Sequence, residues 1–195
     1  KTVVFKTDTT GVDGSVTYAD ASDVTVDTVA IGAGVPVAAS GAKPSDVAAV
    51  TGVTTVAGGT NGAVSLRAGT SASTANTLTV NQAIATTPSG VATAGGSVIL
   101  EAGGAITLQT NGTITTTGNT TGAGGEVFIH HTNAAAGDIT LGKNITATGG
   151  AGGNGGVVTV LNDAGNILIN AAINVSKAGA GTSDGTIQLQ ATASI

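Results

Sequence analysis

A short glycine-led motif that returns about every 30 residues constrains this chain more than any other feature of its sequence. In each copy a glycine begins an alternating segment of the form Gly-x-apolar-x-apolar, and the copies start at Gly62, Gly96, Gly125, Gly156 and Gly185. By subtraction, the starts lie 34, 29, 31 and 29 residues apart. Alternation of apolar and other residues is typical of a β-strand with one buried face, so the motif predicts a series of equivalent strands.

Two further apolar segments follow each complete copy of the motif. The second segments are led by the pairs Leu78/Val80, Ile106/Leu108, Ile139/Leu141 and Ile167/Ile169, and the third by Ile84, Ile114, Ile145 and Ile173. Three strands without a helix cannot bury their apolar faces alone, but repeats stacked at about 4.8 Å form continuous parallel sheets. We therefore expect an all-β fold, a right-handed parallel β-helix (solenoid) of about five to six coils, with about 30 residues and three short strands per coil.

The amino-acid composition predicts a narrow core. Hydrophobic residues make up 41% of the 195 residues, but the chain has only two Phe, one Tyr and no Trp. Aliphatic side chains must therefore fill the interior. The predicted inward ladder of the first strands consists of Val64, Val98, Val127, Val158 and Ile187.

The repeat divides the chain into two regions. Residues 62–195 form regular coils, of which the last, beginning at Gly185, is incomplete. Residues 1–61 form an irregular N-terminal region with an insertion at about 32–61, because the motif-like Gly14 precedes Gly62 by 48 residues.

Charge and composition exclude several classes of function. The formal net charge is −5, with six Lys and Arg residues, so no basic face for nucleic acid is expected. No apolar run reaches the roughly 18 residues of a membrane span, so we expect no membrane insertion. The absence of Cys removes disulfides, zinc-thiolate sites and thiol nucleophiles.

The coil pattern, the abundance of Gly, Thr and Asn, and the absence of Cys resemble the filamentous-haemagglutinin-like adhesins and related β-strand-repeat surface proteins of bacteria. The resemblance covers residues 62–195 well and residues 14–31 weakly, and it is to the shaft of such proteins. It implies an extracellular or cell-surface location and a non-enzymatic structural role, as a rigid building block of a fibre or adhesin. A host-surface or carbohydrate ligand is compatible with it but is not specified by these residues.

The ends of the solenoid are the predicted assembly sites, since an unpaired strand edge invites another strand. The assembly interface is predicted at Val3, Val4, Phe5, Ile187, Leu189 and Ile195. Two partners remain open: copies of the chain stacked head-to-tail, or adjoining repeats of a longer chain.

We expect no metal, cofactor or catalytic residue. His130 and His131 are the only histidines, and the register places His130 beside Glu101 and Arg67 in a partly exposed charge ladder. Calcium is a weaker alternative, because hard oxygen ligands are concentrated near the start of the chain. The acids concerned are Asp8, Asp13, Asp20, Asp23 and Asp27.

Two other functions remain as alternatives. Aligned threonines on the third strands form a ladder that resembles the Thr-x-Thr surfaces of ice-binding proteins, although Thr is also a common strand residue on a solvent face. The aligned sets are Thr115, Thr146 and Asn174, and Thr87, Thr117, Thr148 and Ser176. A carbohydrate-active β-helix enzyme is the other alternative, and it would need clustered charges and an aromatic platform.

Overall fold

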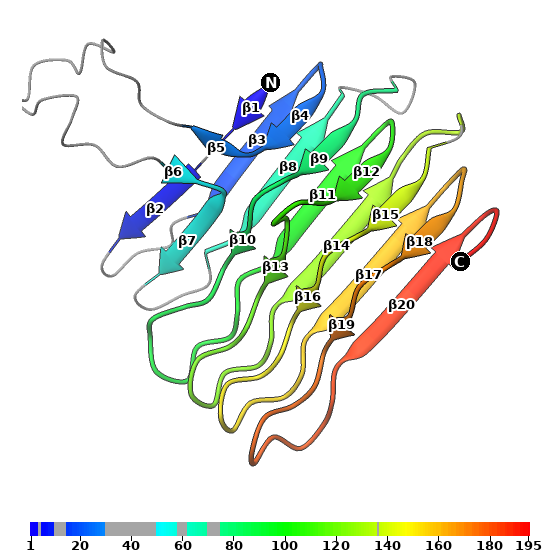
Figure 1. Cartoon of the computed structure of the whole chain (residues 1–195). Coiled ribbons are helices and arrows are strands. Elements are labelled where there is room, and N and C mark those ends of the chain that lie inside the picture. The colour runs from blue at the N-terminus through cyan, green and yellow to red at the C-terminus, as the bar shows by residue number, and fades with distance from the viewer. Residues whose placement is uncertain (4, 10–14, 30–49, 58–61, 70–74, 136) are drawn as a thin grey trace, which may run out of the picture.

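The computed structural model shows an all-β solenoid, and it describes every residue except 4, 10–14, 30–49, 58–61, 70–74 and 136. Three parallel sheets of six strands each run along the molecule, and every sheet receives one strand from each coil (Figure 1). From β8 onward the coils repeat about every 31 residues for about four turns. The fold predicted from the glycine-led motif is thus confirmed.

The glycine-led segments form one sheet, here called sheet C. Its strands are β3 (Val16–Asp20), β8 (Val64–Ala68), β11 (Val98–Ala102), β14 (Glu126–His131), β17 (Val157–Asn162) and β20 (Thr186–Ala191). The register places Val98 between Val64 and Val127, and Val158 beside Ile187. These residues form the single inward column that the sequence predicts.

The second segments form sheet A and the third form sheet B. Sheet A contains β1 (Thr2–Val3), β4 (Val24–Val26), β9 (Leu78–Val80), β12 (Ile106–Leu108), β15 (Ile139–Leu141) and β18 (Ile167–Ile169). Sheet B contains β2 (Phe5–Thr9), β7 (Val53–Ala57), β10 (Ile84–Ala85), β13 (Ile114–Thr115), β16 (Ile145–Thr146) and β19 (Ile173–Asn174). The first residues of the chain therefore form a sheet A strand and a sheet B strand.

The irregular region interrupts one coil between its second and third strands. After β4, a short antiparallel pair forms between β5 (Thr28–Val29) and β6 (Val50–Thr51), and the coil resumes at β7. The sequence placed the insertion at about 32–61, but β7, within that range, pairs with β2 and β10 in sheet B. Much of the predicted insertion, residues 30–49 and 58–61, lies outside the described residues.

Steric packing between coils explains why the motif begins with glycine. A Cβ atom on Gly125 would overlap the carbonyl oxygen of Gly96 in the preceding coil, and Gly156 and Gly185 have the same relation to the coil before each. Coils packed at the spacing of paired strands leave no room for a side chain at this corner. The repeated glycine therefore permits the close approach of successive coils.

Side chains at the corners tie the coil that begins with β14 to the coil that begins with β17. The Asp138 Oδ1 atom accepts hydrogen bonds from the backbone N–H of Asn166 (2.9 Å) and from its side-chain amide (3.0 Å). Asn144 accepts a hydrogen bond from the N–H of Ala172, and Asn154 accepts one from the N–H of Thr182. Each pair is 28 residues apart, so these bonds fix the alignment of neighbouring coils.

Candidate functional site

The outer face of sheet C carries the predicted charge ladder. Arg67, Glu101 and His130 are register neighbours on successive strands, as the sequence predicts. In the part of the chain that the structure describes, however, Lys1 pairs with Asp20 and His130 contacts Asp163, and no ion pair joins members of the ladder. The alignment is confirmed, but Arg67, Glu101 and His130 do not pair with one another.

His130 makes its contacts with two other residues. Its Nε2 atom lies 3.1 Å from the Asp163 Oδ2 atom, and its ring meets the Phe128 ring edge-on at a centroid distance of 5.7 Å. The Asp163 side chain is 52% exposed, so solvent screens the pair and its contribution to stability is at most about 1 kcal/mol. Ile99 is the register neighbour of Phe128, so these two outward side chains form a short apolar strip across two adjacent strands.

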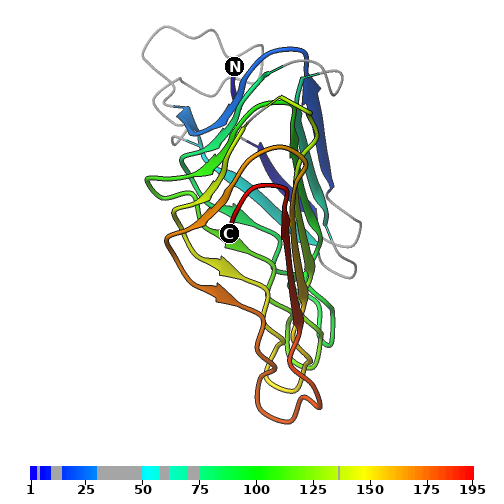
Figure 2. The same ribbon diagram turned by 90° about the vertical axis from the view of Figure 1, so that its right-hand side faces the viewer.

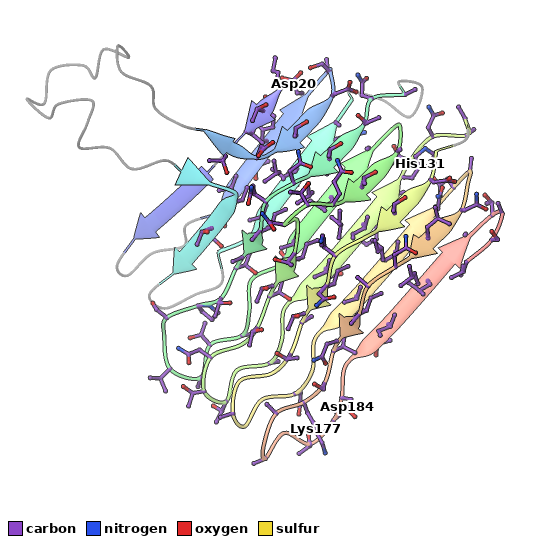
Figure 3. The ribbon with its side chains drawn as sticks, viewed as in Figure 1. Asp20, His131, Lys177 and Asp184 are labelled. Carbon is purple, nitrogen blue, oxygen red and sulfur yellow. The ribbon has the colours of Figure 1, made fainter. Side chains whose placement is uncertain are left out.

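His131 occupies a different environment from its neighbour. It is fully buried in the solenoid, between Ala102 and Asn162 in the register, and neither ring nitrogen has a hydrogen-bond partner. Figure 3 labels it in the body of the solenoid, well away from either end. Strict alternation from Val127 through Ile129 places His131 inward, so the sequence contained the signal for its burial.

The buried Asn162 side chain links the corner loop that follows β14 to the corner loop that follows β17. Its side-chain amide donates to the carbonyl oxygens of Gly137 (2.9 Å) and Asn166 (2.8 Å), and its Oδ1 atom accepts from the Ala164 N–H (3.1 Å). A Cβ atom on Gly137 would lie 2.6 Å from the His131 Nε2 atom, which shows how closely the loop covers the imidazole. These hydrogen bonds hold the corner together beside the buried imidazole.

Threonine columns follow the outer faces of sheets A and B. In sheet B, Thr115 pairs with Thr146 and Thr146 with Asn174, as the sequence predicts, and Ala85 of β10 occupies the next position of the column. Thr117 and Thr148 are linked through their Oγ1 atoms at 3.2 Å. The sequence reasoning missed a longer column at the centre of the sheet A strands. It consists of Thr2, Thr25, Thr79, Thr107 and Thr140.

The acidic residues near the start of the chain bind groups of the protein itself. Asp20 accepts hydrogen bonds from Lys1, Tyr18 and Ser22. The hydrogen bond from the Lys1 ammonium is the main cause of a pKa for Asp20 far below the ordinary value of a carboxyl. The pKa of Lys1 is raised by the same bond, and burial raises the pKa of Tyr18.

Asp23 and Asp27 are engaged in the same way. The Thr77 N–H donates to Asp23 (2.7 Å) and the Asn81 amide donates to Asp27 (3.1 Å), and each bond lowers the pKa of the carboxyl that accepts it. The side chains of Asp8 and Asp13 lie outside the described residues. Within the described residues, no group of three or more His, Asp or Glu side chains could hold a metal ion.

The predicted assembly residues lie at opposite ends of the solenoid. At the C-terminal end, Ile187 is 43% exposed, Ile195 is 65% exposed and Leu189 is partly buried. At the N-terminal end, Val3 is only 8% exposed. Phe5 lies in β2, and Val4 and the Phe5 side chain lie outside the described residues.

Comparisons with known proteins identify no relative of this chain. No protein-family description, curated protein or solved structure matches this chain. Over the described residues there is no helix long and apolar enough to cross a membrane.

Proposed function

We propose that this protein is a non-enzymatic structural element, a rigid β-helical building block of an extracellular fibre or cell-surface adhesin. The observation that carries the proposal is the uninterrupted pairing of all three sheets along the molecule, over a core of stacked aliphatic side chains. Each coil is bonded through its backbone to the coils on either side. Such a column resists bending and stretching, because any change in length breaks hydrogen bonds in three sheets together.

His130 and Asp163 form a lone surface pair, and the described residues near them provide no nucleophile and no second acid in hydrogen-bond contact. General acid–base or nucleophilic catalysis needs several such groups held at hydrogen-bond distance. No described cluster therefore favours the carbohydrate-active enzyme.

Two measurements test the proposal. Small-angle scattering and electron microscopy of the purified chain are expected to give a straight particle of constant cross-section. An antibody raised against the solenoid is expected to label intact cells as strongly as permeabilised ones. A flexible particle would contradict the rigid element, and labelling only after permeabilisation would contradict the extracellular location.

The threonine column of sheet A favours ice binding as a second candidate function. Five successive strands place one hydroxyl each at the regular spacing of a parallel sheet, about 4.8 Å. The test is thermal hysteresis of the wild-type chain and of Thr107→Lys, with Thr159→Lys on sheet C as the matched control. Hysteresis that only Thr107→Lys abolishes would support this function, and no hysteresis in the wild type would reject it.

A further inference from the structure

His131 is the one ionisable side chain among the buried residues that the structure describes. Figure 2 looks along the stacked coils and shows the three sheets surrounding one narrow interior, which aliphatic side chains fill. The other polar side chains buried in the described part of the chain are Thr and Asn, which acids do not charge. They are Thr55, Thr86, Thr116, Asn133 and Asn162. Within this described interior, a proton can therefore place a charge at His131 alone.

Among the described residues, no group accepts a hydrogen bond from the His131 ring. The side chain lies between Ala102 of β11 and Asn162 of β17 in the register, and both ring nitrogens are without a partner. The Asn162 Oδ1 atom already accepts a hydrogen bond from the Ala164 N–H (3.1 Å). Both nitrogens of a protonated imidazole are donors, and a buried charge whose donors have no acceptor is costly. The closed solenoid therefore favours the neutral form of this ring.

The charged residues on the elements around His131 contact other groups or lie on the outer face. Asp163 contacts His130, and Asp138 accepts its hydrogen bonds from the next coil. Glu101 lies on the outer face of sheet C, in register with His130. The strands β12 and β15 contain no charged residue. None of these groups forms an ion pair or a hydrogen bond with His131, so none offsets a charge on its ring.

The corner after β14 covers the imidazole, and it is longer than the corresponding corners of the two neighbouring coils. A Cβ atom on Gly137 would lie 2.6 Å from the His131 Nε2 atom. Gly137 is attached to the next coil by two hydrogen bonds. Its N–H donates to the Ala164 carbonyl oxygen (2.9 Å), and its own carbonyl oxygen accepts from the Asn162 amide (2.9 Å). Displacing Gly137 would bring water to Nε2 and would break these two bonds. The corners comprise residues 132–138 after β14, 103–105 after β11 and 163–166 after β17.

We propose that protonation of His131 opens the corner after β14, so that the solenoid loosens at this coil in mildly acidic solution while the other coils keep their pairing. Imidazole is the side chain whose charge ordinarily changes between about pH 5 and pH 8. The closed corner holds the neutral ring, and the open corner exposes the ring to water, where it takes up a proton. Because the open state binds more protons, its population rises as the pH falls. The other described coils stay closed, because their buried side chains do not titrate.

The first experiment measures hydrogen exchange of the Gly137 N–H, with each rate corrected for the intrinsic effect of pH. Binding of one proton on opening changes the protection by up to about tenfold per pH unit. We expect at least a tenfold loss of protection from about pH 7 to pH 5 in the wild type, and none in His131→Leu or His131→Asn. The Asn variant repeats the residue that β17 has at this register position, so it tests the proposal even if the Leu variant does not fold. His130→Leu is the matched control and is expected to behave as the wild type. The same pH dependence in the wild type and in a folded His131 variant would overturn the proposal.

The second experiment follows protonation of the two imidazoles by NMR, with the single variants assigning their signals. His131 is expected to take up its proton only as the protection of the Gly137 N–H falls, whereas His130 titrates with the corner closed. Titration of His131 in a corner that stays protected would refute the proposal. The Val64 N–H, which donates to the Ser97 carbonyl oxygen (2.8 Å) in a distant coil, is the reference amide. An equal loss of protection at Val64 would show that acid unfolds the whole chain, which also contradicts opening of one corner.

Discussion

The two ends of this solenoid share one backbone arrangement and differ in their side chains. Each end has one edge strand from each of the three sheets: β1, β2 and β3 at one end, and β18, β19 and β20 at the other. At the N-terminal end Asp20 of β3 pairs with Lys1, and the inward residues Val3 and Val16 are 8% and 7% exposed. At the C-terminal end the strands β18, β19 and β20 are uncharged, and Ile169 and Ile187 are 40% and 43% exposed. The comparison teaches that one backbone arrangement can leave inward side chains nearly buried at one end and partly exposed at the other.

The largest expected effect comes from a charge placed in the interior column. Ile139 is fully buried, so Ile139→Asp would leave an unpaired carboxylate in the core, and we expect a loss of about 4 kcal/mol or more, enough to unfold the chain. Ile169→Asp lies in the same sheet but at the open end, and we expect a loss of roughly 1 kcal/mol because water reaches the new carboxylate. Chemical denaturation followed by circular dichroism measures both. Equal losses would mean that solvent does not reach Ile169.

A smaller effect is expected from filling the glycine corner. In Gly156→Ala the new Cβ overlaps the Gly125 carbonyl oxygen, and β17 cannot move away because β14 and β20 hold it on both sides. We expect a loss of about 1–3 kcal/mol. Gly185→Ala creates the same overlap before β20, which pairs on one side and can shift, so the loss should be smaller. A larger loss at Gly185 in thermal unfolding would contradict this view of the C-terminal end.

Much of the solenoid could be predicted from the sequence, because each stacked coil must bury the same kind of side chain at the same position. The spacing of the glycines gave all the later strands of sheet C, and the paired apolar residues gave those of sheets A and B. The position of β7 could not be read in this way. Its Val53 takes the place that an isoleucine fills in the later coils, and the partner strand β2 lies 48 residues earlier.

The candidate sites were less predictable than the fold. The His130–Asp163 pair joins residues 33 positions apart and depends on how the loop after β17 turns, which periodicity does not encode. The hydrogen bonds that close the N-terminal end around Asp20 are of the same kind. The alternation of inward and outward residues is sufficient to predict both the sheet A threonine column and the burial of His131. Neither was predicted, because the alternation was not applied to these positions.

The adjacent histidines provide a third test, away from both ends of the solenoid. It compares the stability contribution of a buried histidine with that of a surface histidine. His131→Leu removes a buried imidazole without hydrogen-bond partners, so we expect stability to be unchanged or to rise by about 1 kcal/mol. His130→Leu loses the surface pair with Asp163, so we expect a fall of at most about 1 kcal/mol. Urea denaturation at neutral pH measures both. A strong loss in His131→Leu would show that the imidazole has a partner in solution.

The smallest effect is expected from the carboxyl group that closes the N-terminal end. The pKa of Asp20 is lowered in the folded chain, chiefly by the hydrogen bond from Lys1, so its contribution to stability is present above the ordinary value of 3.8. That contribution is lost as the pH falls through the lower pKa of the folded state. In Asp20→Asn, we therefore expect a lower melting temperature than in the wild type at pH 6, and the two should converge as the solution is acidified from pH 4 towards pH 2. Parallel curves over this range would mean that the Lys1–Asp20 pair does not stabilise the N-terminal end.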